Sequence, residues 1–169
     1  PQPMNYATSS QKTTFVRNAS RAGADWNFLA TLRDRWPGKL VVKGVQSVED
    51  ALRIKTIGAD AIYVSNHGGR QLDGAMSSIT ALPAIVEAIG DRAEVWMDGG
   101  IRSGQDVLRA IALGAKGTMI GRAFLYGLGA KGQAGVRQTL EIIHKELDLT
   151  LGLCGQSDLA KVDSSILLK

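Results

Sequence analysis

The sequence contains little cysteine, few aromatic residues and no long apolar run. Cys154 is the only cysteine in 169 residues, so an intrachain disulfide is excluded. No secretory signal is recognisable, and both features predict a reducing, cytoplasmic location. No apolar stretch approaches the roughly 18 residues that a membrane-spanning helix requires. The net charge of +4 is too small to indicate nucleic-acid binding. The remaining composition, 44% hydrophobic and 21% charged, is typical of one globular domain.

The first 24 residues differ from the rest of the chain in charge and pattern. Residues 1–24 contain Lys12, Arg17 and Arg21 and no acidic residue, and they are rich in Ser, Thr, Asn and Gln. This composition, without apolar periodicity, predicts a mobile basic loop. The loop is either solvated or in contact with an anionic membrane surface. Because the chain begins with proline rather than methionine, we also expect a cleaved or partial product, with its folded domain at residues 25–169.

Apolar periodicity after residue 25 predicts strands that alternate with helices. Asp25 and Ser47 have the side chains of N-caps, and Gly58 occupies the position of a glycine that ends a helix. Short apolar runs predict four buried strands, and a period of about 3.6 residues predicts the helices. The expected strands are 40–43, 61–65, 94–98 and 117–121, and the expected helices are 26–36, 48–57, 79–89, 105–113 and 135–151. This alternation is typical of a parallel α/β sheet.

An internal repeat narrows the fold class. Residues 43–53 align with residues 99–109 at an offset of 56, and the same offset places Gly58 on Gly114. Two such copies make a four-stranded half of a (β/α)8 TIM barrel, although duplication within a doubly wound open sheet would give a similar signal. A complete barrel needs about 250 residues, so we expect the C-terminal half, strands five to eight. The N-terminal half would come from upstream sequence, or two half-barrels would dimerise.

The most informative segment is Ser65–Gln71, which follows the second expected strand. A histidine just past a strand end can act as a base near neutral pH, and His67 has this position. Arg70 lies three residues further on and can hold a carboxylate through two parallel hydrogen bonds. The two glycines between them allow a sharp turn and the close approach of a ligand. The segment therefore predicts proton abstraction from a small carboxylic acid.

Two glycine-rich loops follow the third and fourth expected strands. They are Asp98–Gly104 and Gly121–Arg122, and in a barrel such loops bind phosphate through backbone N–H groups and a helix N-terminus. Arg102 and Arg122 would add charge-assisted hydrogen bonds to the same phosphate. Lys43, at the end of an apolar strand, has two interpretations: a structural salt bridge, or a buried cation beside a cofactor ring.

These motifs resemble those of the FMN-dependent α-hydroxy acid oxidases and dehydrogenases. That family includes L-lactate dehydrogenase, mandelate dehydrogenase and glycolate oxidase. The resemblance covers almost all of the chain from Asp25 onward, and the segments that carry it are Lys43–Val45, Ser65–Gln71, Asp98–Arg102 and Gly121–Tyr126. Two further segments, Leu72–Gly74 and Gly132–Val136, are most similar to the bacterial membrane-associated lactate and mandelate dehydrogenases.

The resemblance implies a role for each site residue. His67 would take a proton from a 2-hydroxy acid while the FMN accepts a hydride or its electronic equivalent, and Arg70 would hold the carboxylate. Lys43 would stabilise the reduced flavin ring, Ser65 would contact the flavin, and Asp98 would bind the ribityl hydroxyls. The residues expected around the phosphate are Gly99, Gly100, Arg102, Gly121 and Arg122. No metal site is predicted.

The resemblance also implies partners. We expect a substrate of the lactate or mandelate class, the N-terminal half of the same barrel, and a homotetramer. We further expect peripheral contact with the inner face of the cell membrane and a quinone or other electron acceptor. Two other classes of function stay open: another flavin barrel, such as a type 2 isopentenyl diphosphate isomerase, and a non-catalytic half-barrel that binds a phosphate compound. The pairing of His67 with Arg70 argues against the isomerase, because an isoprenoid diphosphate has no carboxylate.

Overall fold

The computed structural model describes residues 24–168 and divides the chain into two compact units, 1–39 and 40–169. The prediction of a mobile loop at residues 1–24 falls, apart from Ala24, outside the described residues. The described part of the first unit contains helix α2, Trp26–Arg35. Asp25 begins this helix as predicted, since its side chain accepts a hydrogen bond from the Phe28 N–H at 2.8 Å.

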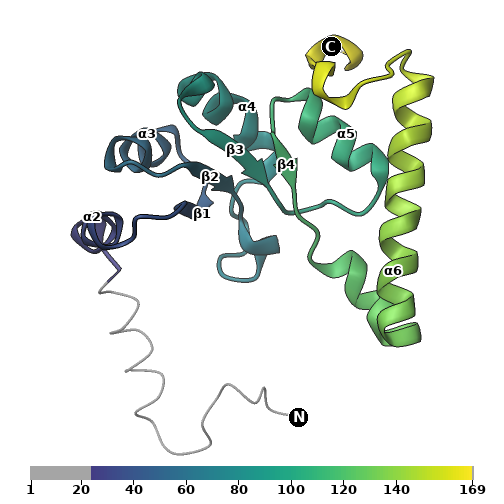
Figure 1. Ribbon diagram of the computed structural model, residues 1–169, viewed down its shortest axis with the longest axis horizontal. Coiled ribbons are helices and arrows are strands. Elements are labelled where there is room, and N and C mark those ends of the chain that lie inside the picture. The colour runs from purple at the N-terminus through teal and green to yellow at the C-terminus, as the bar shows by residue number, and fades with distance from the viewer. Residues whose placement is uncertain (1–23, 169) are drawn as a thin grey trace, which may run out of the picture. The chain divides into compact units, whose positions relative to one another are not determined.

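The second unit contains a four-stranded parallel sheet with strand order β1-β2-β3-β4 (Figure 1). The strands are β1 Val41–Val45, β2 Ala61–Val64, β3 Glu94–Met97 and β4 Gly117–Thr118. The helices are α3 Val48–Ile57, α4 Ser78–Ile89, α5 Gly104–Ala112 and α6 Arg122–Leu153, with short 3-10 turns at His67–Gly69, Gly90–Arg92, Leu159–Lys161 and Ser164–Ile166. The predicted parallel α/β sheet is therefore present.

The sheet is wound in one direction only. Each strand pairs with the next along the chain, and the order never reverses. Because crossovers between parallel strands are right-handed, an order without reversal places every connecting helix on the same face. Figure 1 shows α3, α4 and α5 following the outer side of the sheet. A doubly wound sheet would need a reversal, so that alternative is not what the described strands form.

The two faces of the sheet differ in chemistry. Side chains alternate along a strand, so Ile62 and Val64 face the helices, where they are fully buried with Leu82, Ile85 and Ile89. The opposite face carries Lys43, Tyr63 and Trp96, which lie in register across β1, β2 and β3. The Tyr63 and Trp96 rings pack edge to face with centroids 6.5 Å apart. One face is thus an aliphatic core, and the other has polar and aromatic side chains.

The internal repeat is visible in the helix ends. Ser47 and Ser103 both accept a hydrogen bond from the backbone N–H three residues later, at the start of α3 and α5. Gly58 and Gly114 both have φ of 98°, a left-handed conformation that favours glycine. The equivalent positions of the two repeats therefore have the same local structure at the start and after the end of a helix, as the sequence predicts.

The last helix differs most from its prediction. It begins at Arg122 rather than at residue 135, and it is kinked where Lys131 and Gly132 leave helical geometry. Glycines at 127, 129 and 132 weaken the helical pattern of the first segment in the sequence. Close contact holds the segment in place, because a Cβ on Gly135 would lie 1.9 Å from the Gly127 carbonyl oxygen. Among residues 24–168, no helix combines the length and apolar character needed to cross a bilayer.

Candidate functional site

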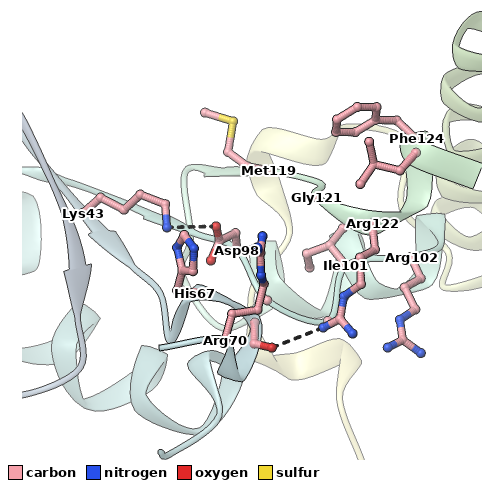
Figure 2. A pocket seen from close by; sticks show the side chains of 14 residues that line it. Lys43, His67, Arg70, Asp98, Ile101, Arg102, Met119, Gly121, Arg122 and Phe124 are labelled. Atoms are coloured by element: carbon pink, nitrogen blue, oxygen red, sulfur yellow. Dashed lines mark hydrogen bonds and ion pairs between the residues drawn. The ribbon is translucent and has the colours of Figure 1, made fainter. Parts of the chain in front are cut away.

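An open pocket of about 340 Å³ lies at the carboxyl ends of the strands (Figure 2). The segments that line it follow β2, β3 and β4, and Lys43 reaches it from β1. The pocket brings together every predicted site residue except Ser65: Lys43, His67, Arg70, Asp98, Gly99, Gly100, Arg102, Gly121 and Arg122. Carboxyl ends of parallel strands meet at one edge of a sheet, which explains why residues so far apart in sequence meet here.

Lys43 and Asp98 form an ion pair at the inner end of the pocket (Figure 2), with 3.3 Å between Lys43 Nζ and Asp98 Oδ2. The Lys43 ammonium also donates to Ser65 Oγ at 2.9 Å. The expectation that Lys43 is buried is wrong, because its side chain is 45% exposed. It lies on the open face of an edge strand, so its charge stays partly in water while it pairs with Asp98. Of the two interpretations, the salt bridge is present and Lys43 also lines the pocket, whereas its place beside a cofactor ring stays a prediction.

Tyr63 belongs to this cluster, although the sequence analysis did not select it. Its hydroxyl lies 3.3 Å from Asp98 Oδ2, and Lys43 Nζ lies 5.1 Å from its ring centroid. Burial, together with the neighbouring Asp98 carboxylate and its hydrogen bond, raises the pKa of Tyr63 well above its usual range. The Tyr63 hydroxyl therefore keeps its proton near neutral pH and donates it in the hydrogen bond to Asp98. Strand alternation gives a signal for this residue, because the Tyr63 side chain points to the same face of the sheet as Lys43, its register partner on β1.

The turn that carries His67 is strained and firmly held. His67 is the one non-glycine residue with positive φ among residues 24–168, at 54°, a conformation that costs roughly 1–2 kcal/mol for an ordinary side chain. Its N–H donates to Ser65 Oγ at 3.0 Å. The next N–H, of Gly68, donates to Asn66 Oδ1 at 2.9 Å. Ser65 does not line the pocket; it is buried beneath the turn and connects it to Lys43.

The three arginines of the pocket come from three different loops. Arg122 Nη2 approaches the Gly68 carbonyl oxygen at 3.4 Å, which connects the loop after β4 to the His67 turn (Figure 2). The Arg102 N–H donates to Asp106 Oδ2 at 3.0 Å, so the start of α5 fixes the backbone of the loop after β3. Together with Lys43 they make the pocket cationic, which favours an anionic ligand.

Part of the pocket wall is apolar, and sequence reasoning missed it. Ile101, Met119, Phe124 and Leu125 line the side formed by the loops after β3 and β4. Phe124 and Leu125 follow directly after Gly121–Arg122, within the segment of α6 that the periodicity did not predict. An apolar wall in the same pocket as several cations suits a ligand that has both a flat ring system and negative charge.

The family model for FMN-dependent dehydrogenases matches residues 2–169. The chain belongs to this family. A curated L-lactate dehydrogenase from Caulobacter vibrioides (strain NA1000 / CB15N) is 54% identical over 142 residues, which cover 84% of this chain and 37% of that protein. Pre-mycofactocin synthase from Mycolicibacterium smegmatis (strain ATCC 700084 / mc(2)155) is 51% identical over 134 residues, which cover 79% of this chain and 34% of that protein.

Solved structures of the family confirm the α/β fold. A mandelate oxidase with 2-hydroxy-phenylacetamide has a TM-score of 0.79 and 47% identity, covering 81% of this chain and 41% of that one. A mandelate oxidase with (S)-4-hydroxymandelic acid has a TM-score of 0.78 and covers 80% of this chain and 38% of that one. This chain thus spans about two fifths of the length of these relatives.

FMN is the cofactor of this family, and the pocket fits it. Asp98 Oδ1 is buried and has no hydrogen-bond partner among the described residues, and an unpaired buried carboxylate oxygen is costly unless a donor reaches it. The ribityl hydroxyls of FMN are such donors. Lys43, Arg102 and Arg122 place positive charge in the pocket, as an anionic cofactor requires. The apolar wall at Met119 and Phe124 suits its flat ring.

Proposed function

We propose that this chain carries the catalytic half of an enzyme that oxidises a small L-2-hydroxy acid to the 2-keto acid with FMN. The observation that carries the proposal is the meeting of His67 and Arg70 with Lys43 and Asp98 in one pocket. A base and a carboxylate clamp suit a 2-hydroxy acid. The names of the relatives, L-lactate dehydrogenase and mandelate oxidase, support the same class.

Each polar side chain has a task in this reaction. Arg70 binds the substrate carboxylate and so fixes the orientation of the substrate. His67 takes one proton from the substrate as the hydroxyl carbon is oxidised to a carbonyl. FMN, when bound, would accept the second hydrogen together with the two electrons, as a hydride or its electronic equivalent. Lys43, held by Asp98 and Ser65, places positive charge at the inner end of the pocket, where it would stabilise negative charge on a reduced flavin.

The flavin would be held by the remaining predicted residues. Asp98 Oδ1 would accept a hydrogen bond from a ribityl hydroxyl. Ser65, which the resemblance implies to contact the flavin, is buried and does not line the pocket, so it would support the flavin through Lys43. The phosphate would lie among the backbone N–H groups of Gly99, Gly100 and Gly121 and the side chains of Arg102 and Arg122.

We also propose that the chain supplies strands five to eight of a (β/α)8 barrel. Support comes from the sheet, whose strand order runs in one direction so that its connecting helices lie on one face, and from the share of the relatives that the chain covers. The N-terminal half would pair with β1 and β4 and close the barrel. The homotetramer, the peripheral membrane contact and the quinone or other acceptor stay predictions.

Anaerobic reduction of bound FMN tests the proposed function. The complete barrel, loaded with FMN, is mixed with L-lactate, L-mandelate and other 2-hydroxy acids, and the visible flavin spectrum is recorded. We expect bleaching by at least one L-2-hydroxy acid and release of the matching 2-keto acid. If the flavin binds but no hydroxy acid bleaches it, the oxidase proposal is wrong. Turnover of an isoprenoid diphosphate instead would favour the isomerase, and phosphate binding without flavin would favour the non-catalytic half-barrel.

A further inference from the structure

The backbone between β2 and α4 adopts an unusual sequence of conformations. His67, Gly68 and Gly69 have φ of 54°, 65° and 73°, so three consecutive residues are left-handed. Such a run persists only where the surrounding structure holds it. Because the run begins at the proposed base, whatever holds it also sets where the His67 side chain points.

Three side-chain oxygens hold this turn. Two belong to residues of the turn itself: Ser65 Oγ binds the His67 N–H, and Asn66 Oδ1 binds the Gly68 N–H. The third comes from outside, because Ser78 Oγ accepts the Asn66 N–H at 3.1 Å. Ser78 is the first residue of α4. It does not line the pocket, and the reaction described above does not use it.

Ser78 also touches the loop that follows β3. A Cβ added to Gly99 would lie 2.8 Å from Ser78 Oγ and 3.1 Å from Asn66 Oδ1. The hydroxyl therefore sits between the backbone of the His67 turn and the backbone next to Asp98. The Ser78 side chain is 2% exposed, and a hydroxyl at so buried a position is expected to have a specific hydrogen-bonding task.

We propose that Ser78 is a positioning residue that fixes the His67 turn against the Asp98–Gly99 loop. It contacts neither substrate nor the reacting atoms, and it acts through Asn66 on the orientation of His67. The inference rests on the proposed function for its effect on turnover. Loss of the Ser78 acceptor leaves the Asn66 N–H without its bond, and the turn relaxes. A small misplacement of a catalytic group can lower the rate by up to about 10²-fold.

The matched variants are Ser78→Cys, Ser78→Thr and Ser77→Ala. Cysteine replaces the hydroxyl by a thiol that is somewhat larger and only a weak acceptor, whereas threonine keeps the hydroxyl. Ser77 is the adjacent serine; it is exposed, and its hydroxyl pairs with Thr80 Oγ1 at 2.6 Å. All variants are made in the complete FMN-loaded barrel. The measurements are flavin absorbance per protein, kcat and KM separately for a 2-hydroxy acid, and amide hydrogen exchange of the peptide that spans residues 65–71.

We expect Ser78→Cys to keep its FMN, to lose about 10–100-fold in kcat, and to exchange the amides of residues 66–68 faster. Ser78→Thr should recover most of both effects, and Ser77→Ala should match the wild type. Ser78→Cys with wild-type kcat and wild-type exchange would overturn the inference, as would a Ser78→Thr variant that folds and is no better than Ser78→Cys. A wild-type enzyme inactive on every 2-hydroxy acid would contradict the proposed function instead. The exchange of residues 66–68 would still decide whether Ser78 holds the turn.

Discussion

At the scale of single residues, the pocket depends on side chains that hold other side chains. Ser65 Oγ is within hydrogen-bond distance of both Lys43 Nζ and the His67 N–H, so one buried hydroxyl connects the inner cation to the base. Asp98 binds Lys43 and Tyr63 through Oδ2, whereas its buried Oδ1 has no hydrogen-bond partner among the described residues. The chemistry proposed for His67 and Arg70 therefore relies on supporting side chains that the sequence motifs show only in part.

His67→Gln should keep FMN and lose turnover. Glutamine cannot take up a proton near neutral pH, and general base catalysis typically contributes about 10²–10⁴-fold. Steady-state kcat and the flavin absorbance per protein are measured together, so that loss of cofactor is separated from loss of chemistry. His144→Gln is the matched control, because His144 is exposed on α6. Near-normal turnover of His67→Gln with bound FMN would remove His67 from the mechanism.

Tyr63→Phe should change how stability depends on alkaline pH. The pKa of Tyr63 is raised in the folded protein above its ordinary value of 10.0 by burial and by Asp98. A group whose folded pKa is raised contributes stability that is complete below its unfolded pKa and is lost as pH rises above it. The free energy of unfolding of the wild type should therefore fall more steeply than that of Tyr63→Phe above about pH 10. Parallel pH profiles for the two proteins would contradict the burial of an uncharged Tyr63.

At the scale of elements, the sequence predicts most strands and helices because local chemistry decides them. Helix ends are set by residues within one helical turn, so the sequence alone can indicate them. Examples are the N-caps Asp25, Ser47 and Ser103 and the C-terminal glycine Gly58. The first segment of α6 is stabilised instead by contact between Gly127 and Gly135, which no periodicity reports. The same holds for the site: motif residues were predictable, whereas Tyr63 and Ser78 become visible only once register and packing place them.

Helix α5 is fixed to α6 by a glycine, and this contact should be sensitive to a single methyl group. A Cβ on Gly104 would lie 2.0 Å from the Leu147 backbone N, and the Gly104 N–H donates to Glu146 Oε2 at 2.9 Å. Since the obstacle is backbone, Gly104→Ala should destabilise the protein by about 1–3 kcal/mol or more. Denaturant unfolding of the complete barrel measures the change.

Gly129→Ala is the matched control for that substitution. Gly129 lies in the first segment of α6, and a Cβ there would meet no atom within 4 Å. Alanine is favoured over glycine inside a helix by about 1 kcal/mol, so this variant should be slightly more stable than the wild type. Equal effects of the two substitutions would show that the α5–α6 contact is looser than the structure has it.

At the scale of the whole molecule, the described residues of the second unit form a sheet in which β1 and β4 each pair with one neighbour only, and their connecting helices lie on one face. Strand β1 exposes Val41, and β4 is only two residues long. The chain after β4 exposes several large apolar side chains: Met119, Leu125, Tyr126 and Leu128. Unpaired strand edges and exposed apolar surface promote association in water. The proposed N-terminal half would cover these edges and the opposite face together.

The 169-residue chain alone should therefore fail to form a monomeric flavoprotein. We expect it to aggregate or self-associate, and to bind FMN weakly, because half of the barrel wall and both strand edges remain in water. Light scattering after size exclusion, together with visible flavin absorbance and thermal unfolding, tests this. The control adds the N-terminal part of the Caulobacter vibrioides L-lactate dehydrogenase as a separate chain. If the two halves form one barrel, this addition should restore soluble protein with bound flavin. A purified chain that is monomeric, binds FMN and melts cooperatively without any partner would show that this half is self-sufficient and that the half-barrel proposal is mistaken.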